Sequence, residues 1–140
     1  MKTSGKLLTI LFALFVVLSG CSDDDGTGID SNLFGQWTLE QITLRDCANA
    51  NDNSVTDVSC TAQNCRQIEI GDDERYQIVN IERGITETEN GQIQINPTQI
   101  NLLPDNSTGN TVYEYTVTAT TLTLTRANVI CTEVRTYSKN

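Results

Sequence analysis

The sequence has no histidine, and its single methionine is the first residue. Histidine is the usual general base near neutral pH and the commonest metal ligand, so its absence removes both roles. Acidic groups remain, but the run Asp72-Asp73-Glu74 falls where the chain is expected to turn, which favours a solvated loop. We therefore predict that the protein is not an enzyme and that it has no cofactor and no metal site.

Basic residues are scarce: the chain has 9 Lys and Arg against 18 Asp and Glu, a net charge of −9. Without residues 1–20, which contain two lysines, 7 basic and 18 acidic residues remain and the net charge is −11. Such a chain has no basic stripe to displace counterions from phosphates, so we expect no nucleic-acid partner. It also lacks the polybasic segment that would hold it on anionic lipid head groups.

Long apolar runs are absent after residue 20, and the run before it covers only residues 7–18. As a helix this run would rise about 18 Å, well short of the ~30 Å of a hydrocarbon core. It follows Lys2 and Lys6 at the N-terminus, which is the pattern of a secretory signal peptide. We predict that residues 1–20 form this signal.

The signal ends in Leu18-Ser19-Gly20-Cys21, which resembles the lipobox of bacterial lipoproteins. The resemblance implies that Cys21 becomes the mature N-terminus, carries a diacylglyceryl group on its thiol and is acylated on its amine. Several acyl chains together anchor a protein stably, whereas a single chain binds only marginally. The alternative is an ordinary signal peptide followed by a structural Cys21.

Residues 21–32 are rich in acids and glycines and show no hydrophobic period, which predicts a flexible tether. Its run Ser22-Asp23-Asp24-Asp25 resembles the acidic export signal of surface lipoproteins in the Bacteroidetes. The predicted location is therefore the outer membrane, with a lipid anchor and the domain exposed at the cell surface. A solvated spacer with the domain facing the periplasm is the alternative.

Four cysteines remain beyond Cys21, namely Cys47, Cys60, Cys65 and Cys131. In an exported chain, four thiols predict two disulfides, and the spacing alone leaves three connectivities open. Zinc is the competing interpretation, but the chain offers neither a C-x-x-C pair nor a histidine to complete a site. Two disulfides would leave no thiol nucleophile.

Helical periodicity is missing after residue 33, and short alternating segments rich in β-branched and aromatic residues replace it. Turn-like breaks separate these segments, and Asn90-Gly91 predicts a hairpin turn. The connection at residues 46–64 is long, polar and expected to have no secondary structure. The pattern indicates an all-β antiparallel meander, closed as a barrel or folded as a sandwich. The predicted strands cover residues 36–44, 66–70, 75–81, 92–95, 98–103, 111–117, 121–126 and 129–137.

Gly35-x-Trp37, at the start of the first predicted strand, resembles the G-x-W motif of lipocalins. The stretches 71–76, 91–95 and 115–125 extend the resemblance to the small lipocalin-like domains of Bacteroidetes lipoproteins, over residues 33–138. It implies an antiparallel up-and-down eight-stranded β-barrel at residues 33–140, with a long disulfide-bearing first loop. Further lipocalin motifs and the C-terminal helix of that family are not found.

In such a barrel the last strand lies beside the first, so the resemblance implies closure by Gly35, Trp37 and Arg135, with Arg126 as the second choice of cation. It also implies pairing of Cys47 with Cys131 and of Cys60 with Cys65, at the end opposite Trp37. The alternative pairs Cys47 with Cys60 and Cys65 with Cys131. The cysteine loop would then lie over the open mouth of the barrel.

The predicted inner face includes aromatic and aliphatic side chains and extends to Ile130 and Val134 on the last strand. We expect a small apolar ligand at the mouth, and the alternative is a filled barrel that serves as an accessory subunit of a surface complex. The candidate ligand-lining residues are Tyr76, Ile78, Ile93, Ile95, Tyr113, Tyr115, Leu122 and Leu124.

Overall fold

The computed structural model describes residues 28–140. The predicted signal peptide at residues 1–20, the predicted lipidation site Cys21 and most of the predicted tether lie outside the described residues. Between residues 28 and 140, no helix is long and apolar enough to cross a membrane.

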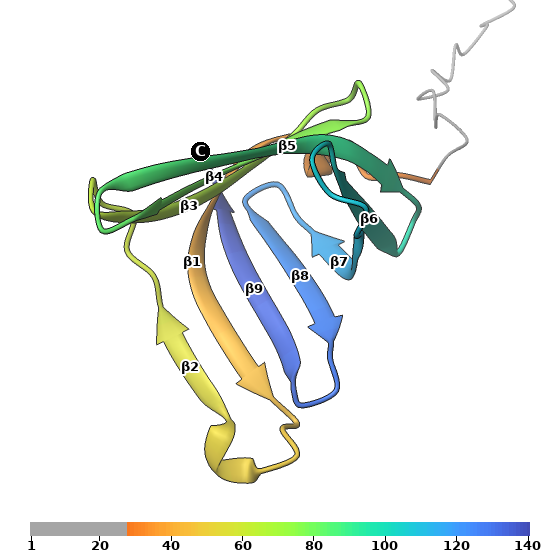
Figure 1. Ribbon diagram of the computed structural model, residues 1–140. Helices are drawn as coiled ribbons and strands as arrows, with labels where there is room; N and C mark the ends of the chain where they lie inside the picture. The colour runs from red at the N-terminus through yellow and green to blue at the C-terminus, as the bar shows by residue number, and fades with distance from the viewer. Residues whose placement is uncertain (1–27) are drawn as a thin grey trace, which may run out of the picture.

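The described chain is built almost entirely of β-strands joined by short turns (Figure 1). Two short 3₁₀ helices are the exceptions, η1 (Ser31–Leu33) before the first strand and η2 (Ala50–Asp52) after it. The strands are β1 (Gly35–Arg45), β2 (Ser54–Asp57), β3 (Asn64–Ile70), β4 (Arg75–Glu82), β5 (Ile85–Ile95), β6 (Gln99–Pro104), β7 (Thr111–Val117), β8 (Thr121–Ala127) and β9 (Thr132–Lys139).

Eight of the strands, β1 and β3 to β9, form a closed antiparallel barrel. Each strand pairs with the next, and β1 closes the ring because it pairs with β3 on one side and β9 on the other. Trp37 lies at this closure, opposite Ile68 on β3 and Lys139 on β9. Figure 1 shows β1 beside β9, with β3, β4 and β5 running across one end of them. The predicted up-and-down eight-stranded barrel is confirmed.

The long connection after β1 is more structured than expected, because it contains η2 and β2. β3 pairs with β1 only from Gly35 to Thr38, so the rest of that β1 edge would be unpaired. β2 pairs with this edge from Gln41 to Leu44 and lies beside it in Figure 1. An open strand edge is an aggregation hazard, and β2 covers it.

The predicted hairpin at Asn90-Gly91 is wrong, since both residues lie inside β5. The turn is at Arg83-Gly84, where the φ angles are 52° and 77°. Gly91 is needed for packing, because a Cβ there would lie 2.5 Å from Cε1 of Tyr76 and 2.3 Å from the carbonyl oxygen of Leu103. The glycine thus lets β5 pass close over the Tyr76 ring.

The barrel interior contains one continuous apolar core. Leu33 is fully buried beneath Trp37, and Ile29 packs against the same core, so the last residues of the predicted tether belong to the fold. A bulge between Leu39 and Gln41 changes which β1 residues face inward, and it brings Ile42 to the core. The buried core residues are Leu33, Trp37, Leu39, Ile68, Ile70, Tyr76, Ile78, Ile93, Ile100, Leu102, Tyr113, Tyr115, Leu122, Leu124 and Tyr137.

The predicted inner face of the last strand is wrong by one residue. Tyr137 is buried in the core, and because strand residues alternate, Arg135 and Glu133 share its inward face. Val134 therefore faces the other side, and Ile130 precedes the strand and is 62% exposed. A shift of one residue moves every side chain of a strand to the opposite face.

Candidate functional site

Trp37 closes one end of the barrel. Its indole Nε1 donates a hydrogen bond to the carbonyl oxygen of Leu33 at 2.9 Å. The Lys139 ammonium lies 4.9 Å from the centre of the indole ring and donates to the carbonyl oxygen of Asn32 at 2.9 Å. The expected contact between Trp37 and Arg135 is therefore wrong, because Arg135 lies opposite Ile42, further along β1. Lys139 is the cation at this closure.

Gly35 allows this arrangement in two ways. Its φ of 126° lies in a region that residues with side chains rarely adopt. A Cβ at this position would also lie 3.2 Å from Cε of Lys139, in the space through which the lysine reaches Trp37. The glycine of the G-x-W motif thus makes room for the closing lysine.

The two disulfides lie at the opposite end of the barrel. Cys47, just after β1, is bonded to Cys131, just before β9, and Cys60 is bonded to Cys65 at the start of β3. The backbone N–H of Ala48 also donates to the carbonyl oxygen of Ile130 at 2.8 Å. The preferred pairing expected from the sequence is confirmed, and we call this end of the barrel the cysteine end.

Seven of the eight candidate ligand-lining residues are buried in the core, and Ile95 is partly buried against it. Their positions on the inner wall agree with the sequence analysis, while contact with a ligand stays a prediction. Burial and the hydrogen bond from the Tyr76 hydroxyl to Oε1 of Glu89, 2.7 Å long, raise the pKa of that phenol well above its usual range. Tyr76 is therefore a neutral hydrogen-bond donor.

A charged layer lines the inner wall at the cysteine end, and it consists of Arg66, Arg126, Glu133 and Arg135. The first two residues continue the inward faces of β3 and β8, which carry Ile68 and Leu124. Side-chain exposure is 14% for Glu133, 15% for Arg135 and 36% for Arg126. The interior thus changes along its length, from fully apolar beneath Trp37 to charged near the disulfides.

Glu133 lies between two of the arginines. Its Oε1 is 2.5 Å from Nε of Arg135, and its Oε2 is 3.7 Å from Nη2 of Arg126. Neither contact has hydrogen-bond geometry, and the buried Nε atoms of Arg66, Arg126 and Arg135 have no hydrogen-bond partner in the described structure. Buried polar atoms without partners are uncommon, so these three Nε atoms call for an explanation.

Two tyrosines complete the electrostatics of the charged layer. The Tyr113 ring centre lies 5.7 Å from Cζ of Arg126 and 5.9 Å from Cζ of Arg135. Burial disfavours the charged form of Arg135, but Tyr113, Tyr137 and Glu133 outweigh it and raise the pKa of the guanidinium. Burial raises the pKa of Tyr137 against the opposing effect of Arg135 and Arg66. Arg135 is therefore charged and Tyr137 neutral at physiological pH.

The sequence pattern does not predict this layer. It assigns no role to Arg66, and it predicts the arginines on the last two strands only as partners of Trp37. The charged layer could be predicted from the orientation of β9. If Tyr137 faces inward, Glu133 and Arg135 face inward as well, because alternate residues of a strand share a face. Assigning Lys139 rather than Arg135 as the partner of Trp37 would leave Arg135 available for the charged layer.

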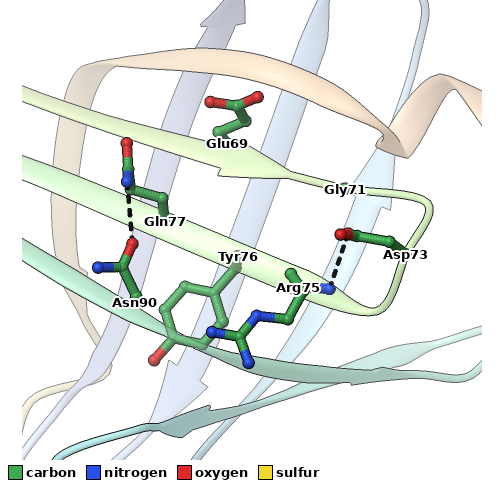
Figure 2. Close-up of a pocket in the computed structure, with 7 residues that line it drawn as sticks. All are labelled: Glu69, Gly71, Asp73, Arg75, Tyr76, Gln77 and Asn90. Atoms are coloured by element: carbon green, nitrogen blue, oxygen red, sulfur yellow. Dashed lines mark hydrogen bonds between the residues drawn. The ribbon is translucent and has the colours of Figure 1, made fainter.

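A hollow of about 260 Å³ lies on the outer surface near the β3–β4 turn (Figure 2). Its polar groups bind one another: Nε2 of Gln77 donates to Oδ1 of Asn90 at 2.9 Å, and the Arg75 backbone N–H donates to Asp73. The Arg75 guanidinium pairs with Asp105 at 2.7 Å. Because these groups already have partners, the hollow does not offer the open donors found in the charged layer. Its lining residues are Glu69, Gly71, Asp73, Arg75, Tyr76, Gln77 and Asn90.

Between residues 28 and 140, no three Asp, Glu or Cys side chains are grouped as metal ligands. The feature that defines the molecule is instead the closed barrel, with a tryptophan-capped end and a disulfide-bonded end.

This arrangement is a lipocalin-like fold. A solved structure of a lipocalin-like protein from Bacteroides uniformis matches with a TM-score of 0.58 and 13% identity, over 78% of this chain and 99% of the other. A second, an uncharacterized protein from Bacteroides eggerthii, matches with a TM-score of 0.56 and 12% identity, over 76% and 98% of the two chains. No protein-family model and no curated protein matches the chain. At these identities the likeness concerns the fold alone.

Proposed function

We propose that this protein is a lipid-anchored lipoprotein of the outer membrane, exposed at the cell surface, whose barrel binds a small, largely apolar molecule at the cysteine end. The lipobox around Cys21 and the acidic residues after it support the location. The lipocalin-like fold supports a binding role, because barrels of this size can hold one small ligand. No catalytic step is part of the proposal.

The change from an apolar to a charged inner wall is the observation that best supports a binding role. A barrel that only needed to be stable could be filled with apolar side chains at both ends, because charged groups are costly to bury. Here the charged layer adjoins an apolar side chain that remains partly exposed, Ile42, which lies opposite Arg135. A ligand site of this kind combines an apolar wall with a few polar groups that fix orientation.

Binding can be tested with Nile red, a neutral fluorescent dye, on a Cys21→Ala protein that has no acyl chains to take up the dye. We expect one dye molecule per barrel. Ile42→Trp should weaken dye binding about tenfold or more, or about 1.4 kcal/mol or more, because the larger side chain would occupy space that the dye needs. Thr43→Trp is the matched control, because the neighbouring residue of a strand faces the other way.

Mass spectrometry of an organic extract from the native protein would identify the natural ligand. An empty extract together with no dye binding would refute the binding role. Equal weakening by Ile42→Trp and Thr43→Trp would show that the dye binds outside the barrel.

The location depends on Cys21. We expect Cys21→Ala to move the protein from the membrane fraction to the soluble fraction, because the acyl chains supply the anchor. Immunoblots of the separated fractions measure this, with the native protein as the control. Protease treatment of intact cells should digest the barrel, whereas protection would mean that it faces the periplasm.

An accessory role in a surface complex is the second candidate. Val129 is fully exposed and Ile130 is 62% exposed, and both lie on the turn that ends at the Cys47–Cys131 bridge. Exposed apolar side chains that lie together often mark a protein interface. This role requires a stoichiometric partner that is lost in Val129→Asp while Nile red binding is unchanged.

A further inference from the structure

The inner wall at the cysteine end has an excess of positive charge. Between residues 28 and 140 the chain has seven basic residues, and three of them are the arginines of the charged layer. Glu133 is the only carboxylate that pairs with them there. Glu89, on β5, lies on a strand that pairs with none of those carrying the arginines, and the Tyr76 hydroxyl donates to it. An otherwise acidic protein thus concentrates cations inside its mouth, where low-dielectric walls strengthen their attraction for an anion.

The arginines also keep hydrogen-bond donors available. A guanidinium carries five N–H donors, and the two contacts of Glu133 satisfy few of them. Arg66 forms no ion pair with any carboxylate of the described residues, and its Nε has no hydrogen-bond partner. The layer therefore has the charge and the donors to bind one further anion.

Tyrosines hold two of these guanidiniums in place. Arg126 and Arg135 share the Tyr113 ring, which orients them by cation–π contacts. Tyr137 is buried, and the positive charges of Arg135 and Arg66 both act on the pKa of its phenol. Preorganised donors lose less freedom when a ligand binds.

The position of Glu133 indicates which anion fits. Its carboxylate lies between Arg126 and Arg135, so the layer already accommodates one planar carboxylate. Arginine binds such groups through paired, parallel hydrogen bonds. The wall beside the layer is apolar, with Ile42 opposite Arg135 on β1 and Leu124 opposite it on β8. A carboxylate on an apolar body matches both surfaces.

We infer that the charged layer binds the carboxylate of a small amphiphilic acid, with Arg66 and Arg135 as its main partners and the apolar body of the acid at the mouth. This inference rests on the proposed function and specifies its ligand class. Glu133 holds Arg135 in place in the free protein, and the ligand carboxylate complements the positive charge that the three arginines leave in excess of Glu133.

Displacement of Nile red from the Cys21→Ala protein tests the inference without further variants. We expect laurate to displace the dye at a concentration about tenfold or more below that of dodecanol, which has the same chain and no charge. Raising the salt concentration should reduce this preference. Dodecyl phosphate tests the chemistry of the head group, and displacement by it at lower concentration than laurate would overturn the assignment to a carboxylate.

Arginine variants then locate the site. Arg66→Met and Arg135→Met should reduce the preference of laurate over dodecanol towards unity, measured as the ratio of the two displacing concentrations within each variant. Arg75→Met is the matched control, since Arg75 lies on the outer surface and pairs with Asp105, and it should keep the preference. Equal displacement by laurate and dodecanol in the parent protein would overturn the inference and leave the proposed function standing. A protein that fails to bind Nile red and also yields an empty organic extract would overturn both.

Discussion

Replacing Trp37 by alanine is expected to lower the free energy of unfolding by about 3–5 kcal/mol. Trp37 is fully buried, and its pairing partners lie on β3 and β9, the two strands that flank β1 in the closed ring. The change would leave a cavity and would remove the hydrogen bond to the Leu33 carbonyl oxygen. Urea unfolding followed by far-ultraviolet circular dichroism measures the effect, because the chain has no other tryptophan to report it by fluorescence.

Two further variants separate the causes. Trp37→Phe keeps most of the buried area but loses the indole N–H, so we expect a loss of about 1–2 kcal/mol. Lys139→Met removes the cation above the ring and should cost about 0.5–1 kcal/mol.

Arg135→Met should leave the emission maximum of Trp37 unchanged, because Arg135 does not contact it. A Trp37→Ala protein as stable as the parent would contradict the closing role of this residue.

The strands were predictable because alternation and turn chemistry are local properties of the chain. All eight predicted strands correspond to strands of the barrel, and the breaks near Gly71, Pro97 and Asn128 are real turns. β2 was missed because its four residues, Ser54–Asp57, are all exposed and show no alternation. It forms only because a neighbouring edge on β1 is open, and that edge depends on the fold as a whole.

The Asn90-Gly91 pair shows why turn signals fail. This dipeptide is favoured in tight hairpins because both positions tolerate positive φ. In this fold the glycine is required for a different reason, the close approach of Tyr76 from β4 and of the Leu103 backbone from β6. Both contacts are distant in sequence, whereas the real turn uses Arg83, a residue with no special preference for positive φ.

The charged layer was not predicted because the wrong face of β9 was assigned to the core. Val134 is apolar and Glu133 and Arg135 are charged, so hydrophobicity alone places Val134 inward. In the structure the opposite face of β9 is inward, because the Tyr137 ring is larger than the Val134 side chain and lies in the apolar part of the barrel. The charged layer follows from this reversal. Sequence reasoning that assigns every charged residue of a strand to the solvent face therefore misses a charged layer on the inner wall.

Removing the Cys47–Cys131 bridge is the second change with a large expected effect. The bridge closes a chain segment with a sequence separation of 84, whereas Cys60 and Cys65 are separated by only 5. If a disulfide acts by restricting the unfolded chain, these separations correspond to about 4.5 and about 2 kcal/mol of stability. The double variant Cys47→Ala with Cys131→Ala should therefore unfold at a clearly lower urea concentration than Cys60→Ala with Cys65→Ala.

The second double variant is the matched control, because both proteins lose one bridge and gain two alanines at the same end of the barrel. The long bridge also joins the end of β1 to the start of β9, which are the two strands that close the ring. Its loss should therefore loosen the mouth and weaken Nile red binding, while the loss of the short bridge should leave dye binding nearly unchanged. Equal losses of stability in the two variants would contradict the dependence on loop length. A larger loss from the short bridge would instead assign the main structural role to the Cys60–Cys65 loop.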